Sequence, residues 1–339
     1  MKSSKEQKGI PFLQLAIRIT ISSSLMVWLL NRIQWDQALQ IMKEGSLVYF
    51  VAAFIAIQLT VGSSVWKWQL LVHSSLQKTE RKNTSLTKLG RYYYIGLFFN
   101  NFLPGSVGGD VVRIFYLGKI IGIPPAATSV AFERLTSGAA LTAIVLVSAL
   151  FMENVRPFLL SIYIVTGAVV VLFVFIGFWM KKGNKSNALI LTTSVPSSKF
   201  SIWKSKGKSA LVKMGESVGN YRSESWKWWV TILVLSAIFQ FGLAWINQLL
   251  FLAFGISIPW VELLVIITLI SVITMLPVSL NGIGVREASY VFFFKELGVP
   301  DELAVSVSLL FFFLVTLSSI FGGVFWLFER RKRFEAIRQ

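Results

Sequence analysis

The sequence predicts an all-α polytopic membrane protein with about six full spans and two re-entrant or broken helical hairpins, related as an inverted repeat. Three observations predict this fold class. Hydrophobic residues make up 55% of the chain and charged residues only 14%, whereas a typical soluble domain has about 25% charged residues. The mean hydropathy is +0.67. Finally, two similar Gly/Pro-rich segments interrupt apolar sequence in the two halves of the chain.

The apolar stretches give the membrane spans, because a helix needs about 20 apolar residues to cross the hydrocarbon core. Full spans are expected at 11–30, 47–66, 126–151, 157–180, 228–254 and 301–328. Two further apolar regions, 87–121 and 260–297, are each broken in the middle. Each is expected to form a re-entrant hairpin or a pair of short crossing helices, which gives eight or more membrane helices when the hairpin arms are counted.

The two interruptions resemble each other. The first reads LPGSVGGDVVR from Leu103 to Arg113, and the second reads LPVSLNGIGVR from Leu276 to Arg286. Each copy is followed by a Gly-aliphatic-Pro turn, at 122–124 and 298–300, and then by a long apolar helix. Paired interruptions in the two halves of a membrane protein indicate a central binding site.

The basic residues predict the orientation, because lysine and arginine gather in cytoplasmic loops. They cluster at the N-terminus, between the second span and the first hairpin (Lys67 and Lys78 among them), along 181–227 and after residue 329. We therefore expect a multi-pass protein of the plasma (inner) membrane, with both termini and the 181–227 connection in the cytoplasm. Three full spans then separate the hairpins, so the first is entered from the cytoplasm and the second from outside.

The chain is interpreted as a single integral membrane domain over 1–339. Its first half covers about 10–180 and carries the 87–121 hairpin, and the basic connection follows at 181–227. The second half covers 228–328 with the 260–297 hairpin, and a basic tail occupies 329–339.

Composition also excludes several kinds of chemistry. The chain has no cysteine and one histidine, His73, so a zinc site, which needs several such ligands, is not expected. The net charge of +17 lies mostly in the cytoplasmic segments, which argues against a nucleic-acid partner. No lysine of the nucleotide-binding phosphate loop follows the glycines, so no nucleotide is expected. No cofactor, metal or catalytic residue is predicted.

Ionisable residues inside apolar sequence are the strongest functional candidates, because each costs roughly 2.5–3.5 kcal/mol at the membrane centre. Asp110 and Arg113 have the i,i+3 spacing that shares one helical face. Glu133 and Arg134 lie near the start of the following span, and Arg286 and Glu287 follow the second break. A purely structural role, in which these charges neutralise one another and pin the hairpins, stays open.

Broken helices also leave backbone groups unpaired, which is tolerated only inside protein or beside a wet cavity. Helix N-termini beside an arginine bind anions, and a phosphate is the natural ligand. Asn101 could contact either the freed backbone or the ligand. The candidate binding residues are Asn101, Ser106, Gly108, Gly109, Asp110, Arg113, Glu133, Arg134, Ser279, Asn281, Gly282, Gly284, Arg286 and Glu287.

Residues 100–113 (NNFLPGSVGGDVVR), 131–135 (AFERL) and 276–287 (LPVSLNGIGVRE) together resemble the lysylphosphatidylglycerol synthase transmembrane family. This flippase-like integral membrane domain also occurs without a synthase, and the similarity covers about residues 10–328. The resemblance implies movement of a lipid or a lipid-linked headgroup between leaflets. Its polar positions correspond here to Asn101, Ser106, Gly109, Asp110, Arg113, Glu133, Arg134, Gly282, Gly284, Arg286 and Glu287.

The same resemblance gives the expected partners. Stand-alone members are tied to varied lipids, including polyprenyl-linked and hopanoid-type ones, so we expect a membrane lipid of this kind or an anionic phospholipid. A synthase domain would need a few hundred further residues, and the chain ends at Gln339. Headgroup synthesis is therefore not expected.

The leading hypothesis is a lipid translocase in which a lipid phosphate engages Arg113 from one side and Arg286 from the other. Rocking of the two repeats would alternate access. Without an ATP-binding motif, transport would be passive or coupled to protons, with Asp110, Glu133 or Glu287 as carriers. The alternatives are an integral-membrane enzyme acting on a lipid phosphate, or a non-catalytic partner of a glycosyltransferase or lipid-modifying enzyme. Against the enzyme, the chain has only three aspartates and they do not cluster. An aspartate cluster would be needed to hold Mg²⁺ against a diphosphate.

Overall fold

The computed structural model describes residues 35–76, 80–102, 108–152, 158–164, 166–167, 171, 218–275, 279 and 282–338. All regular structure in these residues is helical. Four of the described helices are long and apolar enough to cross a membrane: α3 (Leu47–Ser74), α6 (Ile123–Leu150), α9 (Trp226–Leu252) and α12 (Asp301–Arg338). They confirm the predicted all-α polytopic fold class.

These helices match the apolar stretches predicted at 47–66, 126–151, 228–254 and 301–328. The predicted span at 11–30 lies outside the described residues, as do most of 157–180 and most of the 181–227 connection. Two shorter elements flank α3. The helix α2 (Trp35–Glu44) precedes α3, and a short 3₁₀ helix, η2 (Glu80–Asn83), follows it.

Local sequence explains where several helices begin. The hydroxyl groups of Ser85 and Ser225 each accept a backbone N–H from the first turn of the helix that follows, which satisfies a donor that has no partner within the helix. The helix α6 starts after Gly122, whose φ of 90° is a backbone conformation that glycine adopts readily. It carries proline in its first turn. Proline suits that position because the first-turn N–H has no helical acceptor.

The two interrupted regions form pairs of short helices. The first pair is α4 (Leu86–Asn100) and α5 (Gly108–Ile121), and the second is α10 (Trp260–Met275) and α11 (Val285–Lys295). At a rise of 1.5 Å per residue, the arms are about 16–24 Å long. The hydrocarbon core is about 30 Å thick, so no arm is long enough to cross it alone. The two arms of each pair pack against each other.

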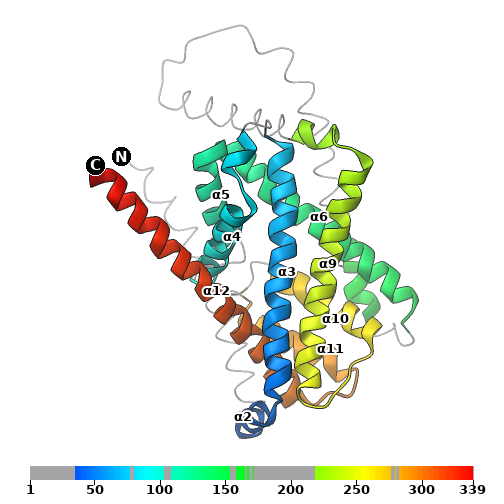
Figure 1. Cartoon of the computed structure of the whole chain (residues 1–339). Coiled ribbons are helices and arrows are strands. Elements are labelled where there is room, and N and C mark those ends of the chain that lie inside the picture. The colour runs from blue at the N-terminus through cyan, green and yellow to red at the C-terminus, as the bar shows by residue number, and fades with distance from the viewer. Residues whose placement is uncertain are drawn as a thin grey trace, which may run out of the picture.

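The hairpins begin at opposite ends of the bundle. The helices α3 and α9 pack side by side, and the N–H of Ser46 donates to the carbonyl of Ala253 at 3.0 Å. The start of α3 is therefore next to the end of α9, so the two helices are antiparallel. Since α3 leads into the first hairpin and α9 into the second, the chain enters them from opposite ends. Figure 1 shows α4 and α5 toward one end of the bundle and α10 and α11 toward the other.

The long helix α12 joins the two halves. It packs against α4 of the first hairpin and against α11 of the second, then continues away from the bundle toward the C-terminus (Figure 1). The contact with α4 is backbone against backbone, because a Cβ added to Gly322 would lie 1.9 Å from the carbonyl oxygen of Tyr94. Only glycine fits at this crossing.

Candidate functional site

The first hairpin is held together by a close approach of two glycines. A Cβ on Gly109 would lie 2.4 Å from the carbonyl oxygen of Gly96, and a Cβ on Gly96 would lie 2.7 Å from Cγ of Arg113. The backbones of α4 and α5 therefore touch where α5 begins. This contact places the first two turns of α5, which carry Asp110 and Arg113, inside the bundle.

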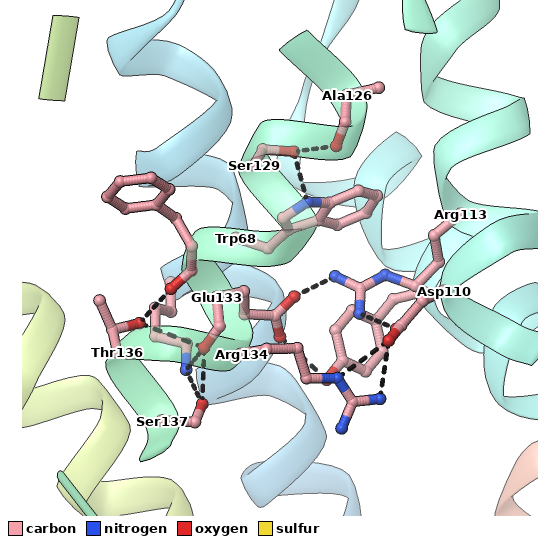
Figure 2. A network of polar contacts seen from close by, with 12 residues as sticks. Trp68, Asp110, Arg113, Ala126, Ser129, Glu133, Arg134, Thr136 and Ser137 are labelled. Carbon is pink, nitrogen blue, oxygen red and sulfur yellow. Dashed lines mark hydrogen bonds and ion pairs between the residues drawn. The ribbon is translucent and has the colours of Figure 1, made fainter. Parts of the chain in front are cut away.

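Four charged side chains form a network between α5 and α6, drawn in Figure 2. The Arg113 guanidinium donates to the Glu133 carboxylate and, at 3.3 Å, to Asp110 Oδ1. Arg134 donates to Asp110 Oδ2 at 2.9 Å. The side chain of Arg113 is only 6% exposed, whereas that of Arg134 is 43% exposed. Asp110 thus joins a buried guanidinium to one that can be reached from outside.

Two aromatic rings lie against the buried guanidinium. The Cζ atom of Arg113 lies 4.2 Å from the ring centre of Trp68 on α3 and 4.1 Å from that of Tyr93 on α4. Both rings are themselves fixed: Trp68 Nε1 donates to Ser129 Oγ at 3.1 Å, and the Tyr93 hydroxyl donates to Glu133 Oε1 at 3.3 Å. A desolvated cation over an aromatic face is stabilised by about 2 kcal/mol.

A buried lysine lies beside this network. The placement of Lys67 in a cytoplasmic loop is wrong, because α3 continues to Ser74 and encloses it; the residue is 1% exposed. Its ammonium group donates to Ser137 Oγ at 2.5 Å, Ser236 Oγ at 3.3 Å and the carbonyl oxygen of Glu133 at 3.4 Å. Lys67 therefore ties α3 to α6 and α9.

The second hairpin carries a smaller cluster at the start of α11. Arg286 Nε lies 3.4 Å from Glu287 Oε1, and the guanidinium lies 4.5 Å from the ring centre of Phe312 on α12. Glu287 Oε2 accepts the N–H of Gly284 at 2.7 Å, and Ser308 Oγ donates to Oε1 at 3.3 Å. The two hairpins thus share an arrangement, a buried arginine with a carboxylate partner and an aromatic face.

The turn before α11 depends on glycine. Gly282 and Gly284 have φ values of 78° and 80°, in the left-handed region that costs other residues roughly 1–2 kcal/mol. The carbonyl of Gly282 accepts the N–H of Arg286 at 2.8 Å. These two glycines let the chain turn sharply enough to begin α11 with its charged pair buried.

A cavity of about 60 Å³ lies beside Arg286. This exceeds the roughly 10–15 Å³ that one water molecule needs, so the space can hold a small polar group. Across it, the Tyr290 hydroxyl donates to Asn247 Oδ1 at 2.6 Å. The remaining lining residues are apolar side chains of α9, α10 and α12. The polar lining consists of Asn247, Ser271, Thr274, Arg286 and Tyr290.

The structure brings the candidate residues together in two separate groups. Asp110, Arg113, Glu133 and Arg134 form the first, and Gly282, Gly284, Arg286 and Glu287 form the second. Arg113 contacts side chains of α3, α4, α5 and α6, whereas Arg286 contacts side chains of α11 and α12 and lines a cavity with residues of α9 and α10. In this conformation the two arginines therefore lie in different binding environments.

The other candidates have more local roles or cannot be placed. Gly108 is buried in the first turn of α5, and the N–H of Gly109 donates to Asn100 Oδ1 at 3.3 Å. Asn101 donates to Ser319 Oγ on α12 at 2.7 Å. Ser279 is buried. Ser106 and Asn281 lie outside the described residues.

Sequence reasoning missed Trp68, Tyr93, Lys67, Asn247 and Tyr290. The aromatic residues looked like the interface belts common in membrane proteins, and no local spacing links Trp68 to Arg113. One signal was available for Lys67, since it lies between two tryptophans in the sequence VWKWQLL. A lysine flanked by large apolar residues on a spanning helix favours a buried position over a loop.

Comparison with known proteins covers most of the chain. Residues 15–323 match the family described as the lysylphosphatidylglycerol synthase TM region. A UPF0104 membrane protein of Pyrococcus horikoshii is 22% identical over 313 residues, which cover 88% of this chain and 91% of that protein. The matched region includes both hairpins and every residue of the two charged clusters.

Proposed function

Because the chain belongs to the lysylphosphatidylglycerol synthase TM region family, we propose that it moves a lipid with an anionic headgroup between the two leaflets of its membrane. The lipid would be an anionic phospholipid or a polyprenyl- or hopanoid-type lipid that carries a phosphate. The membrane would be the plasma (inner) membrane, with both termini on the cytoplasmic side. The acyl or isoprenoid tails would stay in the surrounding lipid while the headgroup passes through the bundle.

One observation carries this function. Two hairpins, each too short to cross the membrane, begin at opposite ends of the bundle, and each holds a buried arginine where its outgoing arm starts. A headgroup entering from either side therefore meets a cation part of the way across. Half-length helices that meet inside a transporter are a common way to build such a site.

The cavity beside Arg286 supports a binding site for the lipid headgroup in the second half of the protein. Its lining includes the guanidinium of Arg286 and the side-chain amide of Asn247 as donors, whereas its hydroxyl groups already donate within the protein. A phosphate oxygen is well suited to such donors, because hydrogen bonds between ionised groups are about twice as strong as neutral ones. The cluster around Arg113 would be the binding site in the first half. The headgroup would therefore bind to the two arginines one after the other and would not bridge them.

Both proposed binding sites favour transport without covalent chemistry. Every carboxylate in them accepts from a guanidinium, an N–H or a hydroxyl group. To carry or donate a proton, such a carboxylate would have to give up one of these contacts. We therefore favour passive exchange of lipid between leaflets over proton-driven transport.

The test is lipid movement in vesicles that contain the purified protein. Fluorescent phosphatidylglycerol placed in one leaflet should reach the other leaflet faster than in protein-free vesicles. Arg286→Gln should slow this movement about tenfold to a hundredfold, the effect of losing one charge-assisted hydrogen bond. The matched control is Lys295→Gln, an exposed cation at the other end of α11, which should keep the wild-type rate. Wild-type protein that moves no lipid, or that converts the lipid into a new product, would contradict this function.

A further inference from the structure

The first charged cluster, taken together with the adjacent Lys67, has one more cation than it has carboxylates. It contains Lys67, Arg113 and Arg134 as cations and Asp110 and Glu133 as carboxylates. No other acidic residue occurs in α3, α4, α5, α6 or α9, the helices that surround Lys67 and Arg113. With all five groups ionised, the cluster carries one net positive charge.

The contacts of Lys67 fit an ammonium ion. The hydroxyl of Ser137 donates to the carbonyl of Glu133, and that of Ser236 donates to the carbonyl of Ile232, both at 2.8 Å. Each serine oxygen therefore turns a lone pair toward Lys67. Together with a backbone carbonyl, they present three acceptors, which match the three N–H groups of an ammonium. A neutral amine would leave one acceptor facing its own lone pair.

The hydrogen bonding of Arg113 also indicates that this cluster has an excess of cations. Arg113 Nε is buried and has no hydrogen-bond acceptor among the described residues, so the cluster is short of an acceptor as well as of a negative charge. A buried cation without full compensation is costly. Arg134 is the member that a ligand can reach, since its side chain is 43% exposed.

We infer that Lys67 makes this cluster select lipids whose headgroup carries one net negative charge, such as a phosphodiester with an uncharged alcohol, over zwitterionic lipids. The inference rests on the proposed lipid movement and names its substrate class. The headgroup phosphate contacts Arg134 at the exposed edge of the cluster. Lys67 does not touch it but supplies the excess charge through the buried network, so it is a specificity residue rather than a contact residue.

The experiment compares two labelled lipids in the same vesicles, phosphatidylglycerol (net charge −1) and phosphatidylcholine (net charge 0). Wild-type protein should move the anionic lipid faster. Lys67→Met keeps the apolar volume and removes the charge, so the ratio of the two rates should fall about tenfold, the effect of one unit charge acting over about 10 Å at an effective dielectric of about 20. Lys67→Arg should retain the ratio. Lys227→Met, which removes an exposed cation at the start of α9, is the control and should also retain it.

The ratio separates selectivity from folding, because a variant that merely folds poorly slows both lipids alike. An unchanged ratio in Lys67→Met would overturn the inference and leave the proposed function standing. Wild-type protein that moves neither lipid would instead refute the proposed function. Loss of the preference in millimolar inorganic phosphate would show that the cluster takes the free anion, and would overturn the assignment to a lipid headgroup.

Discussion

Gly96 and Gly109 pack so closely that a single added methyl group cannot fit between α4 and α5. The Cβ of an alanine at 109 would lie 2.4 Å from the carbonyl oxygen of Gly96, a distance that only a backbone shift can relieve. Since Asp110 and Arg113 follow on the same helix, this contact fixes how deeply the charged turn lies in the bundle. The glycine pair is therefore part of the site although it carries no chemistry.

Gly109→Ala should destabilise the protein by about 1–3 kcal/mol, the usual effect of overpacking, and should move Arg113 relative to Glu133. Gly138→Ala on α6 is the matched control, because a Cβ there meets nothing within 4 Å. Thermal unfolding in detergent measures both. Equal melting temperatures for the two variants would show that α4 and α5 separate at little cost.

Glu133→Gln should be strongly destabilising, by about 3–5 kcal/mol, because it leaves the buried Arg113 with a weaker acceptor in an apolar surrounding. Adding Arg113→Met should restore part of the lost stability, since the uncompensated charge is then removed as well. A double-mutant cycle of unfolding free energies measures this coupling. Additive losses would mean that the two side chains do not depend on each other.

Tyr93 contributes through both its hydroxyl and its ring, and the two can be separated. Tyr93→Phe removes the hydrogen bond to Glu133 and should cost about 0.5–1.5 kcal/mol. Tyr93→Leu also removes the aromatic face over Arg113 and should cost about 2 kcal/mol more. The comparison uses unfolding free energies in the same detergent. Similar losses in both variants would assign no stability to the ring.

Gly284→Ala should destabilise the second hairpin by roughly 1–2 kcal/mol, because alanine is strained at a φ of 80°. Gly62→Ala on α3 is a suitable control, since its Cβ would meet nothing within 4 Å and its backbone is helical. The lipid-movement assay should show the same order, with Gly284→Ala slower. A fully active Gly284→Ala would show that the turn before α11 adapts without loss.

The opposite orientation of the hairpins can be tested chemically, because the natural chain has no cysteine. Lys119→Cys places a thiol near the C-terminal end of α5, and Lys295→Cys places one at the C-terminal end of α11. A membrane-impermeant maleimide added to sealed, oriented vesicles should label one of these thiols from outside and the other only after the membrane is opened. Labelling of both from one side would exclude the inverted arrangement.

The helices were the most predictable part of the molecule. Long apolar runs predicted α3, α6, α9 and α12, since a spanning helix must be apolar along most of its length. The ends were less certain: the apolar run at 47–66 stops at Lys67, yet α3 continues to Ser74. A hydropathy pattern records the cost of a buried lysine but not the three acceptors that reduce it.

The candidate site was predictable in part. The charged residues at each break were visible because ionisable residues are rare in apolar sequence. Their partners were not, because Trp68, Tyr93 and Ser236 reach the cluster from other helices at large sequence separations. The sequence also favoured one phosphate between Arg113 and Arg286, whereas the fold places each arginine in its own group of helices. Only the three-dimensional packing decides which of several equally plausible charges meet.

The packing of α12 has a mechanical consequence. This one continuous helix touches an arm of each hairpin, so a tilt of α12 would change its packing against both. In the proposed lipid movement, a headgroup that displaced one hairpin through α12 would change the affinity at the other hairpin, and linkage requires the reverse effect to be equal in size. The helix α12 is thus the element through which the two proposed headgroup sites would be coupled.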